Sequence, residues 1–152
     1  MSGGVQETFN LKKFRNKSLK CFYTKEYEDI WEVLIQARNK KSVICCNLDP
    51  DENEKEQVLT NGLVKGHAYI ISTLAVIMLN ENEQRLLKCI NPWGSNIEWK
   101  KKWGRKSSLW DKILSETEKK TLLSEVQTPG QFWLGKIIYI FISNFWVKLC
   151  FL

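Results

Sequence analysis

The sequence predicts an α+β fold, and three observations support this class. Apolar residues first recur at helical spacing, within residues 24–40. From residue 67 onward they follow the pattern of β-strands, with a polar turn between two apolar runs. The 152-residue chain, 43% hydrophobic and 26% charged, is long enough to bury one core and lies outside the composition range of disordered proteins. We therefore expect an antiparallel sheet with packed helices.

The helix is predicted over Thr24–Lys40, with Thr24 as its N-cap because a threonine hydroxyl can accept from the first free N–H groups. Residues at i, i+3, i+4, i+7 and i+8 line one face of a helix. The expected apolar face consists of Tyr27, Ile30, Trp31, Leu34 and Ile35.

A short buried strand is expected next, over residues 42–46, where Cys45 and Cys46 would point to opposite faces and serve as packing residues. The chain has five cysteines, no CxxC motif and a single histidine, which argues against a zinc site and for reduced thiols. Residues 1–11 do not resemble a secretory signal. These features predict a cytoplasmic protein.

A β-hairpin is predicted from His67 to Ile90, with one strand reaching Leu79 and a four-residue tip at residues 80–83. Pro92 should end the ladder, because proline has no N–H to donate. Further on, Ser108 precedes Asp111 by three residues in the manner of a capping box, so residues 109–126 are expected to be helical with a break.

The hairpin brings two chemically useful side chains to one end of the sheet. His67 opens one strand and Asn91 follows the antiparallel partner strand. The oxygen of a carboxamide can accept from one imidazole N–H, which fixes the tautomer and leaves the other ring nitrogen facing a nucleophile. The alternative for a lone histidine is a solvated or capping role, and the residue pattern alone does not exclude it.

Two motifs then resemble those of a known family. Residues 62–69 read Gly-Leu-Val-Lys-Gly-His-Ala-Tyr and residues 87–94 read Leu-Lys-Cys-Ile-Asn-Pro-Trp-Gly. They resemble the His and Asn motifs of the calpain family of papain-like cysteine proteases. Residues 2–7, Glu98-Trp99 with Trp103, and residues 130–133 are similar to further family elements in the same order. The resemblance implies the second lobe of a papain-like protease, with residues 1–134 a partial catalytic domain.

Residues 135–152 depart from the family pattern as a divergent apolar tail. A membrane-spanning helix needs about 20 mostly apolar residues, and this run is shorter and interrupted by Ser143, Asn144 and Lys148. We expect an edge strand or a non-native tail, and no membrane span.

The resemblance implies a calpain-like intracellular cysteine endopeptidase acting on protein substrates. His67 would take the thiol proton and later protonate the leaving amine, Asn91 would orient His67, and Trp93 would shield their contact from water. No cysteine here has the Gly-Asp-Cys-Trp setting of the family nucleophile. The chain would therefore supply the His and Asn but not the Cys, and would need a Cys-bearing lobe in cis or in trans. The alternative is a catalytically inactive calpain-like protein-interaction module.

The resemblance also implies a calcium ion in this lobe, and the sequence departs from that pattern. Glu98 remains at one ligand position, but Arg105, Pro129 and Gln131 stand where the family has acidic residues. Calcium takes six to eight oxygen ligands, so a cation among them opposes binding. The acidic residues 49–56 lack the ligand spacing of an EF-hand and are expected to form a solvated loop.

A third function, nucleic-acid binding, is suggested by the net charge of +6 and by residues 99–106, where lysines and arginine alternate with two tryptophans. No helix or repeat extends this basic run. We expect a solvated turn whose tryptophans pack inward, and no nucleic-acid partner.

Overall fold

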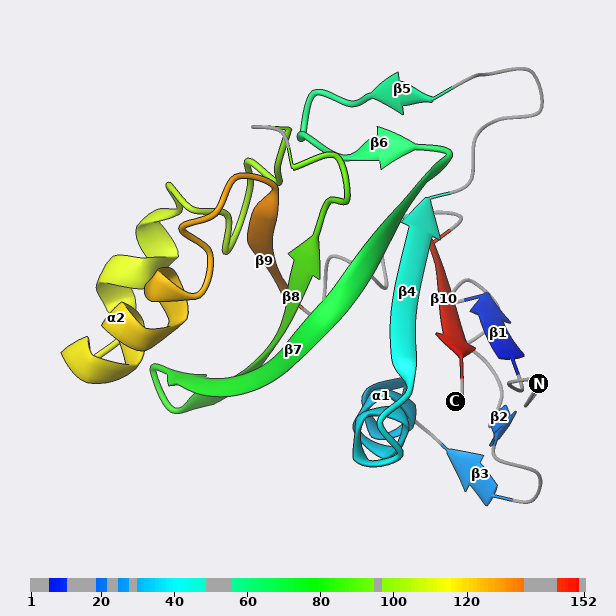
Figure 1. The fold of residues 1–152 in the computed structure, drawn as a ribbon. Helices are drawn as coiled ribbons and strands as arrows, with labels where there is room; N and C mark the ends of the chain where they lie inside the picture. Colours follow the sequence, from blue (N-terminus) through cyan, green and yellow to red (C-terminus); the bar gives the residue numbers. More distant parts are fainter. Residues whose placement is uncertain are drawn as a thin grey trace.

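A computed structural model describes residues 6–10, 19–21, 25–27, 30–48, 56–94, 97–135 and 145–150, with side chains only for residues 30–48, 56–94 and 97–135. The described residues form a six-stranded, fully antiparallel sheet in the order β1-β10-β4-β7-β8-β9 (Figure 1). Its strands are β1 (Gln6–Asn10), β10 (Phe145–Cys150), β4 (Val43–Leu48), β7 (His67–Leu79), β8 (Asn82–Ile90) and β9 (Gln131–Gly135). The α+β class predicted from the sequence is confirmed.

Two small ribbons and three helical segments complete the described part of the chain. The ribbons pair β2 (Leu19–Cys21) with β3 (Lys25–Tyr27), and β5 (Gln57–Val58) with β6 (Val64–Lys65). The helical segments are α1 (Ile30–Asn39), the 3₁₀ helix η2 (Ser108–Lys112) and α2 (Glu116–Ser124). None of the helices in the described residues is long and apolar enough to cross a membrane.

Helix α1 begins later than the sequence predicted. Residues 25–27 form strand β3, so Tyr27 is not on the helix, and Thr24 lies outside the described residues. The buried face of α1 consists of Ile30, Trp31, Val33, Leu34 and Ala37, whereas Ile35 is 38% exposed. The expected face was therefore rotated, because Val33 and Ala37 extend the apolar stripe on its other side. The helix ends where Ser42 N donates to Ala37 O, as in a Schellman motif.

The predicted strand after the helix is confirmed and is slightly longer, as β4. Its burial alternates, so that Ile44, Cys46 and Leu48 face the core while Cys45 lies on the other face. The three cysteines whose side chains are described, Cys45, Cys46 and Cys89, are free thiols.

The hairpin β7–β8 is confirmed, but its tip is shorter than predicted. Leu79 pairs with Asn82, so only Asn80 and Glu81 form the loop. Both have positive φ, 47° and 64°, as a type I′ turn requires. This turn matches the right-handed twist of the strands, so the ladder continues almost to the tip.

A β-bulge in β7 lets this strand contribute side chains to two cores on opposite faces of the sheet. The register of β7 against β8 shifts between Ile71 and Thr73, so Ser72 is the extra residue. Before the bulge, Tyr69 and Ile71 pack in a core with α1, while after it Ile77 packs in a second core beneath η2 and α2. Side chains alternate between the two faces of a strand, so without the extra residue Ile77 would lie on the same face as Tyr69 and Ile71. The bulge moves it to the opposite face.

The second helical segment has the predicted break but different caps. Ser107, not Ser108, caps η2 by accepting from Leu109 N, and Ser115 caps α2 by accepting from Glu118 N. Two indole N–H groups hold these helical segments in place. Trp110 of η2 donates to Gly104 O in the preceding loop, and Trp133 of β9 donates to Leu122 O of α2.

The apolar tail contains an interior strand rather than the edge strand that we expected. Strand β10 lies between β1 and β4, pairing antiparallel with both. Residues 136–144, 151 and 152 lie outside the described residues, as do residues 49–55 of the expected acidic loop.

We expect Leu34→Ala to lower the free energy of unfolding by about 2–5 kcal/mol, because Leu34 is fully buried in the core under α1. Ile35→Ala on the next position of the same helix is the matched control and should cost less than about 1 kcal/mol, since Ile35 is partly exposed. Urea denaturation measures both. Equal costs would show that α1 does not present this face to the sheet.

Candidate active site

The end of the sheet at which β7 begins carries His67 and Asn91 in direct contact. His67 is the first residue of β7, and Asn91 directly follows β8. Ile70 pairs with Ile90, so Asn91 lies on the diagonal from His67 rather than directly opposite it. The Nε2 atom of His67 is 2.8 Å from Oδ1 of Asn91. The predicted neighbourhood of these two side chains is confirmed.

The backbone around His67 explains how the histidine is placed. Gly66 has a φ of 71°, a conformation that glycine adopts without strain, and it turns the chain from β6 into β7. Its N–H donates to Leu48 O on β4 over 2.6 Å. Leu48 also pairs with His67, so strand β4 fixes the position of the His67 backbone and hence the point from which its side chain projects.

The carboxamide of Asn91 has a partner at every polar atom. Its Nδ2 group donates to Ile97 O over 3.2 Å, and its Oδ1 accepts from Trp93 N over 3.0 Å as well as facing His67. The oxygen is thus the atom turned to the ring, and Nε2 of His67 must be the donor. With Asn91 only 1% exposed, this network fixes one orientation of the amide and one tautomer of the neutral imidazole.

Three further side chains surround the His67 ring. Tyr69 packs edge-on at 5.1 Å between ring centroids, and its hydroxyl accepts from Val64 N. Trp93 lies at 4.2 Å, tilted by 46°, on the side away from the core. Glu56 Oε1 is 3.4 Å from Nδ1, the ring nitrogen that Asn91 leaves free. His67 is 6% exposed, whereas Trp93 is 45% exposed, so the indole is the outer cover of the contact.

Burial determines the protonation of two neighbours of this site. It raises the pKa of the Tyr69 phenol above its ordinary value, so Tyr69 stays neutral as a hydrogen-bond partner. Burial, with a contribution from the neighbouring Cys89, also raises the pKa of the Cys46 thiol. A thiol held protonated in the core is a poor nucleophile, so Cys46 is a packing residue, as the sequence indicated.

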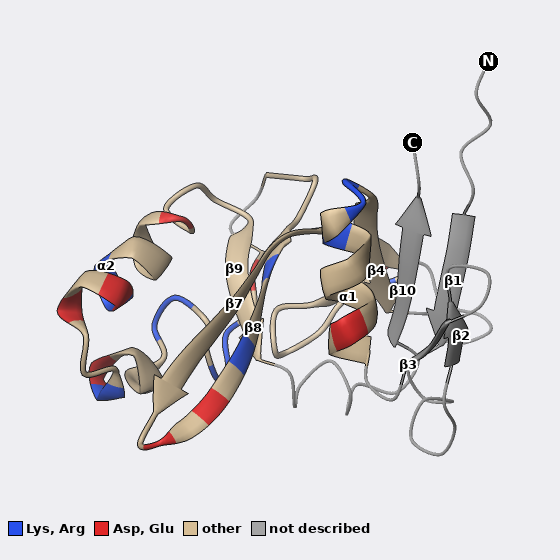
Figure 2. Cartoon of the chain, turned by 90° about the horizontal axis from the view of Figure 1, so that it is seen from below, with Lys and Arg blue, Asp and Glu red and all other residues tan. Residues whose placement is uncertain are grey.

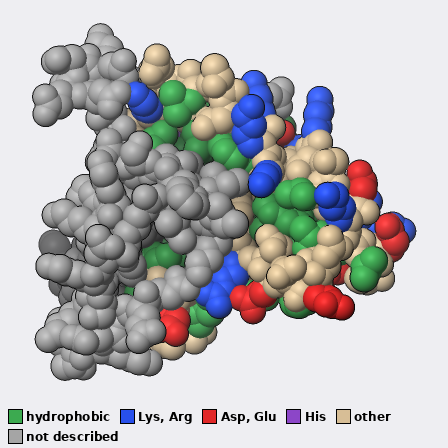
Figure 3. Space-filling model, turned by 180° about the vertical axis from the view of Figure 1, so that it is seen from behind, with side chains coloured by type: hydrophobic (Ala, Val, Ile, Leu, Met, Phe, Trp, Pro, Cys, Tyr) green, Lys and Arg blue, Asp and Glu red, His purple; other side chains and the backbone are tan. Residues whose placement is uncertain are grey.

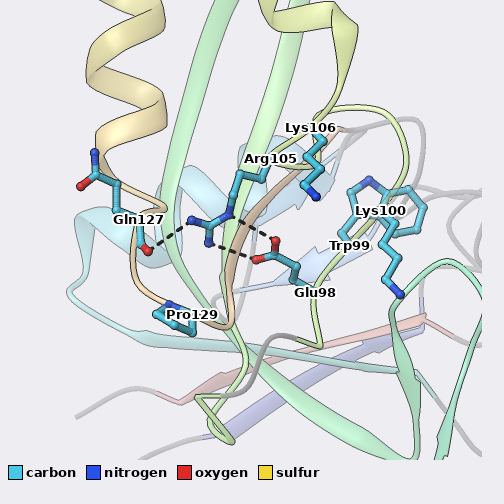
Figure 4. Close-up of a pocket in the computed structure, with 7 residues that line it drawn as sticks. All are labelled: Glu98, Trp99, Lys100, Arg105, Lys106, Gln127 and Pro129. Atoms are coloured by element: carbon cyan, nitrogen blue, oxygen red, sulfur yellow. Dashed lines mark hydrogen bonds and ion pairs between the residues drawn. The ribbon is translucent and has the colours of Figure 1, made fainter.

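Glu98, the expected residual calcium position, does not lie with His67 but in a separate pocket (Figure 4). Its carboxylate is bound by Arg105 through two N–H···O contacts, Nε to Oε1 at 3.2 Å and Nη2 to Oε2 at 3.1 Å. Among the described residues, no group of three His, Cys, Asp or Glu side chains could hold a metal ion.

The basic run beside that pocket has the inward-facing tryptophans that we predicted. Trp99 and Trp103 are 5% and 3% exposed, so neither ring is available to stack on a base. Basic and acidic side chains are interspersed along α2 (Figure 2). On the face seen in Figure 3 the Lys and Arg side chains lie apart rather than in one stripe. Neither α2 nor the described part of the face seen in Figure 3 therefore carries one continuous basic stripe.

Sequence reasoning missed Glu56 and the role of Ile97. Glu56 precedes His67 by eleven residues in an acidic stretch, and no periodic pattern links it to the ring. The partner of Asn91 at Ile97 is a backbone carbonyl, which any residue carries. Gly62 is a residue type that can indicate a close backbone contact. A Cβ at this position would lie 1.8 Å from Glu98 O, so only glycine allows the segment around residue 62 to contact the segment around Glu98.

Comparison with known proteins identifies the family of this chain. The model of the calpain family cysteine proteases matches residues 1–147. The chain belongs to the calpain family. It is 35% identical over 144 residues to calpain clp-4 of Caenorhabditis elegans and 33% identical over 133 residues to calpain-14 of Homo sapiens. These alignments cover 95% and 88% of this chain but 18% and 17% of the relatives, so the chain spans less than a fifth of their length.

We expect Asn91→Ala to disturb both the fold and the tautomer of His67. The substitution removes the side-chain partner of two part-buried backbone groups, Ile97 O and Trp93 N, which should cost about 1–3 kcal/mol. In ¹⁵N NMR of the neutral ring, the wild type should carry its proton on Nε2, and the variant should show both tautomers.

The matched control is Asn39→Ala, at the exposed end of α1, which should leave the His67 spectrum unchanged. A proton on Nδ1 in the wild type would contradict the orientation of the amide.

We expect Cys46 to resist alkylation by iodoacetamide in the native chain, at a rate at least about 100-fold below that in urea, because its thiol is buried and its pKa is raised. Peptide mass spectrometry after timed quenching measures the rate at this residue. Equal native and unfolded rates would place the thiol at the surface.

Proposed function

We propose that this chain is the His/Asn half of a calpain-type cysteine endopeptidase and cleaves protein substrates when a Cys-bearing lobe, in cis or in trans, lies over the His67 face. The observation that supports this most strongly is the 2.8 Å contact between His67 Nε2 and Asn91 Oδ1. Membership of the calpain family adds the reaction class. A cytoplasmic location stays a prediction from the sequence.

In this proposal His67 acts as base and then as acid. Asn91 holds the Nε2 proton, so Nδ1 is the nitrogen that takes the proton of the incoming thiol. The thiolate attacks the scissile carbonyl, and the imidazolium returns its proton to the amine as the peptide bond breaks. Water then hydrolyses the thioester by the same proton route, which restores the thiol and releases the acid.

Asn91 and Trp93 have supporting roles. The carboxamide keeps the ring in one tautomer and one orientation. An imidazole without this partner could rotate or change its tautomer. The indole of Trp93 lies over the histidine and limits the access of water, so the imidazolium–thiolate attraction is less screened. Its 45% exposure is the surface that a docked lobe would cover.

Glu56 is the side chain that a thiol would meet at His67. Its carboxylate faces Nδ1 at 3.4 Å, and half of this side chain is exposed. A contact of this length, with half of the Glu56 side chain in solvent, is worth less than about 1 kcal/mol. The docking of a nucleophile lobe can therefore displace Glu56 at little cost.

The experiment joins this chain to a calpain nucleophile lobe in one polypeptide and follows labelling by a thiol-reactive peptide electrophile. We expect labelling that depends on this chain and falls at least about 100-fold in His67→Ala. Lys119→Met, which breaks an exposed ion pair with Asp111 on the far side of the sheet, is the control and should label normally.

The inactive-module alternative makes the opposite prediction. Labelling equal to that of the nucleophile lobe alone, or unaffected by His67→Ala, would remove the proteolytic function and leave a protein-interaction role.

A further inference from the structure

Arg105 gathers four acceptor contacts from two segments of the chain. Its Nε and Nη2 atoms bind the two oxygens of Glu98, in a fork-to-fork pair. On the other side, Nη1 donates to Gln127 O at 3.2 Å and Nη2 to Thr128 O at 3.4 Å. Figure 4 shows the guanidinium between Glu98 and Gln127, above Pro129. One carboxylate and two carbonyls thus converge on a fixed positive charge.

Buried tryptophans fix the backbone from which Arg105 projects. Trp99 Nε1 donates to Lys102 O over 2.6 Å, and Trp110 Nε1 donates to Gly104 O over 2.8 Å. The backbone just before Arg105 is therefore anchored at two carbonyl groups. A side chain that starts from a fixed backbone loses less entropy when it binds, so the guanidinium is organised in advance for its acceptors.

The two segments that Arg105 joins are also the two that hold Asn91. Ile97 O, next to Glu98, accepts from Asn91 Nδ2, and Gly130 O, two residues beyond Thr128, accepts from Asn91 N. The guanidinium thus links the 98–106 loop, whose neighbour Ile97 accepts from the side chain of Asn91, to the 127–130 turn, which accepts from its backbone N–H. Loss of this link would let the two supports of the carboxamide move independently.

The residues around this point do not fit the calcium ion that the family resemblance implies. Calcium needs six to eight oxygens, most of them charged, and among the described residues Glu98 is the one carboxylate that lines the pocket of about 620 Å³. Both of its oxygens are already used by Arg105. The pocket also holds the cationic Lys100 and Lys106, which would repel a divalent cation.

We propose that Arg105 takes the place of a calcium ion in this lobe. The guanidinium supplies the positive charge that draws the Glu98 loop and the 127–130 turn together, so the fold around Asn91 forms without a metal. This role of Arg105 is independent of the catalysis proposed above, because it concerns the position of Asn91 in the free chain.

The first test compares thermal unfolding of the full chain in EGTA and in a large excess of calcium. We expect the same Tm in both, with no calorimetric heat of calcium binding. A calcium-dependent rise in Tm that Glu98→Gln abolishes would overturn the proposal. This test needs no variant that might fold poorly, and it does not depend on proteolytic activity.

The second test removes the guanidinium. Arg105→Met should lower the Tm by about 4–8 °C and should shift the ¹⁵N–¹H signals of the Asn91 side-chain amide, which a distant structural change would leave in place. Arg105→Lys keeps the charge but loses the fork, so it should restore only part of both losses. Lys106→Met, an exposed cation in the same pocket, is the matched control and should change neither.

An Arg105→Met chain with the Tm and the Asn91 signals of the wild type would contradict the proposal. Such a result would show that the ion pair between Arg105 and Glu98 is a surface contact that does not stabilise the fold.

Discussion

The hydrogen bond between His67 and Asn91 depends on one register. Ile70 pairs with Ile90, and that pairing places the residue after β8 diagonally across from the first residue of β7. A slip by one residue would turn Asn91 to the other face and leave the imidazole without its acceptor. The two-residue turn at Asn80 and Glu81 sets the register at the far end of the hairpin, and the bulge at Ser72 shifts it by one residue before the strands reach His67. The chemistry at one end of the ribbon is therefore determined partly by backbone geometry at the other.

The rest of the structure keeps this end of the ribbon in place from three sides. Leu48 on β4 pairs with His67, Ile97 and Gly130 accept from Asn91, and Arg105 joins the loop and the turn to which these acceptors belong. Each contact comes from a different stretch of sequence. The carboxamide is buried yet fully paired, so its desolvation is offset by hydrogen bonds with a single geometry. These hydrogen bonds give the site one fixed geometry.

The sequence predicted those features that depend on local patterns. The hairpin, the buried strand with its two adjacent cysteines and the position of His67 near Asn91 follow from alternation and from antiparallel geometry. The helix start was wrong because Tyr27 has helical spacing but pairs with Leu19 in a small ribbon, a tertiary contact that spacing does not record. Similarly, Ile35 satisfied the helical pattern but lies on the exposed side of α1.

Features that join distant segments were beyond prediction. The partners of Arg105 at Gln127 and Thr128 are backbone carbonyls, which have no sequence signature. The contact of Glu56 with His67 depends on how residues 57–65 fold back as a short ribbon. The bulge at Ser72 also went unrecognised, because two polar residues, Ser72 and Thr73, interrupt the apolar run of β7 without indicating that one of them is an extra residue in the pairing.

The position of β10 constrains the order in which this sheet can assemble. Strand β1 is paired with β10, and β10 with β4, so the strand nearest the amino end joins the sheet through the strand nearest the carboxyl end. Closing so long a loop carries a large entropic cost, whereas β7 and β8 are joined by two residues. The ribbon that carries His67 can thus nucleate early, and the distal edge is added last, once synthesis has passed residue 150.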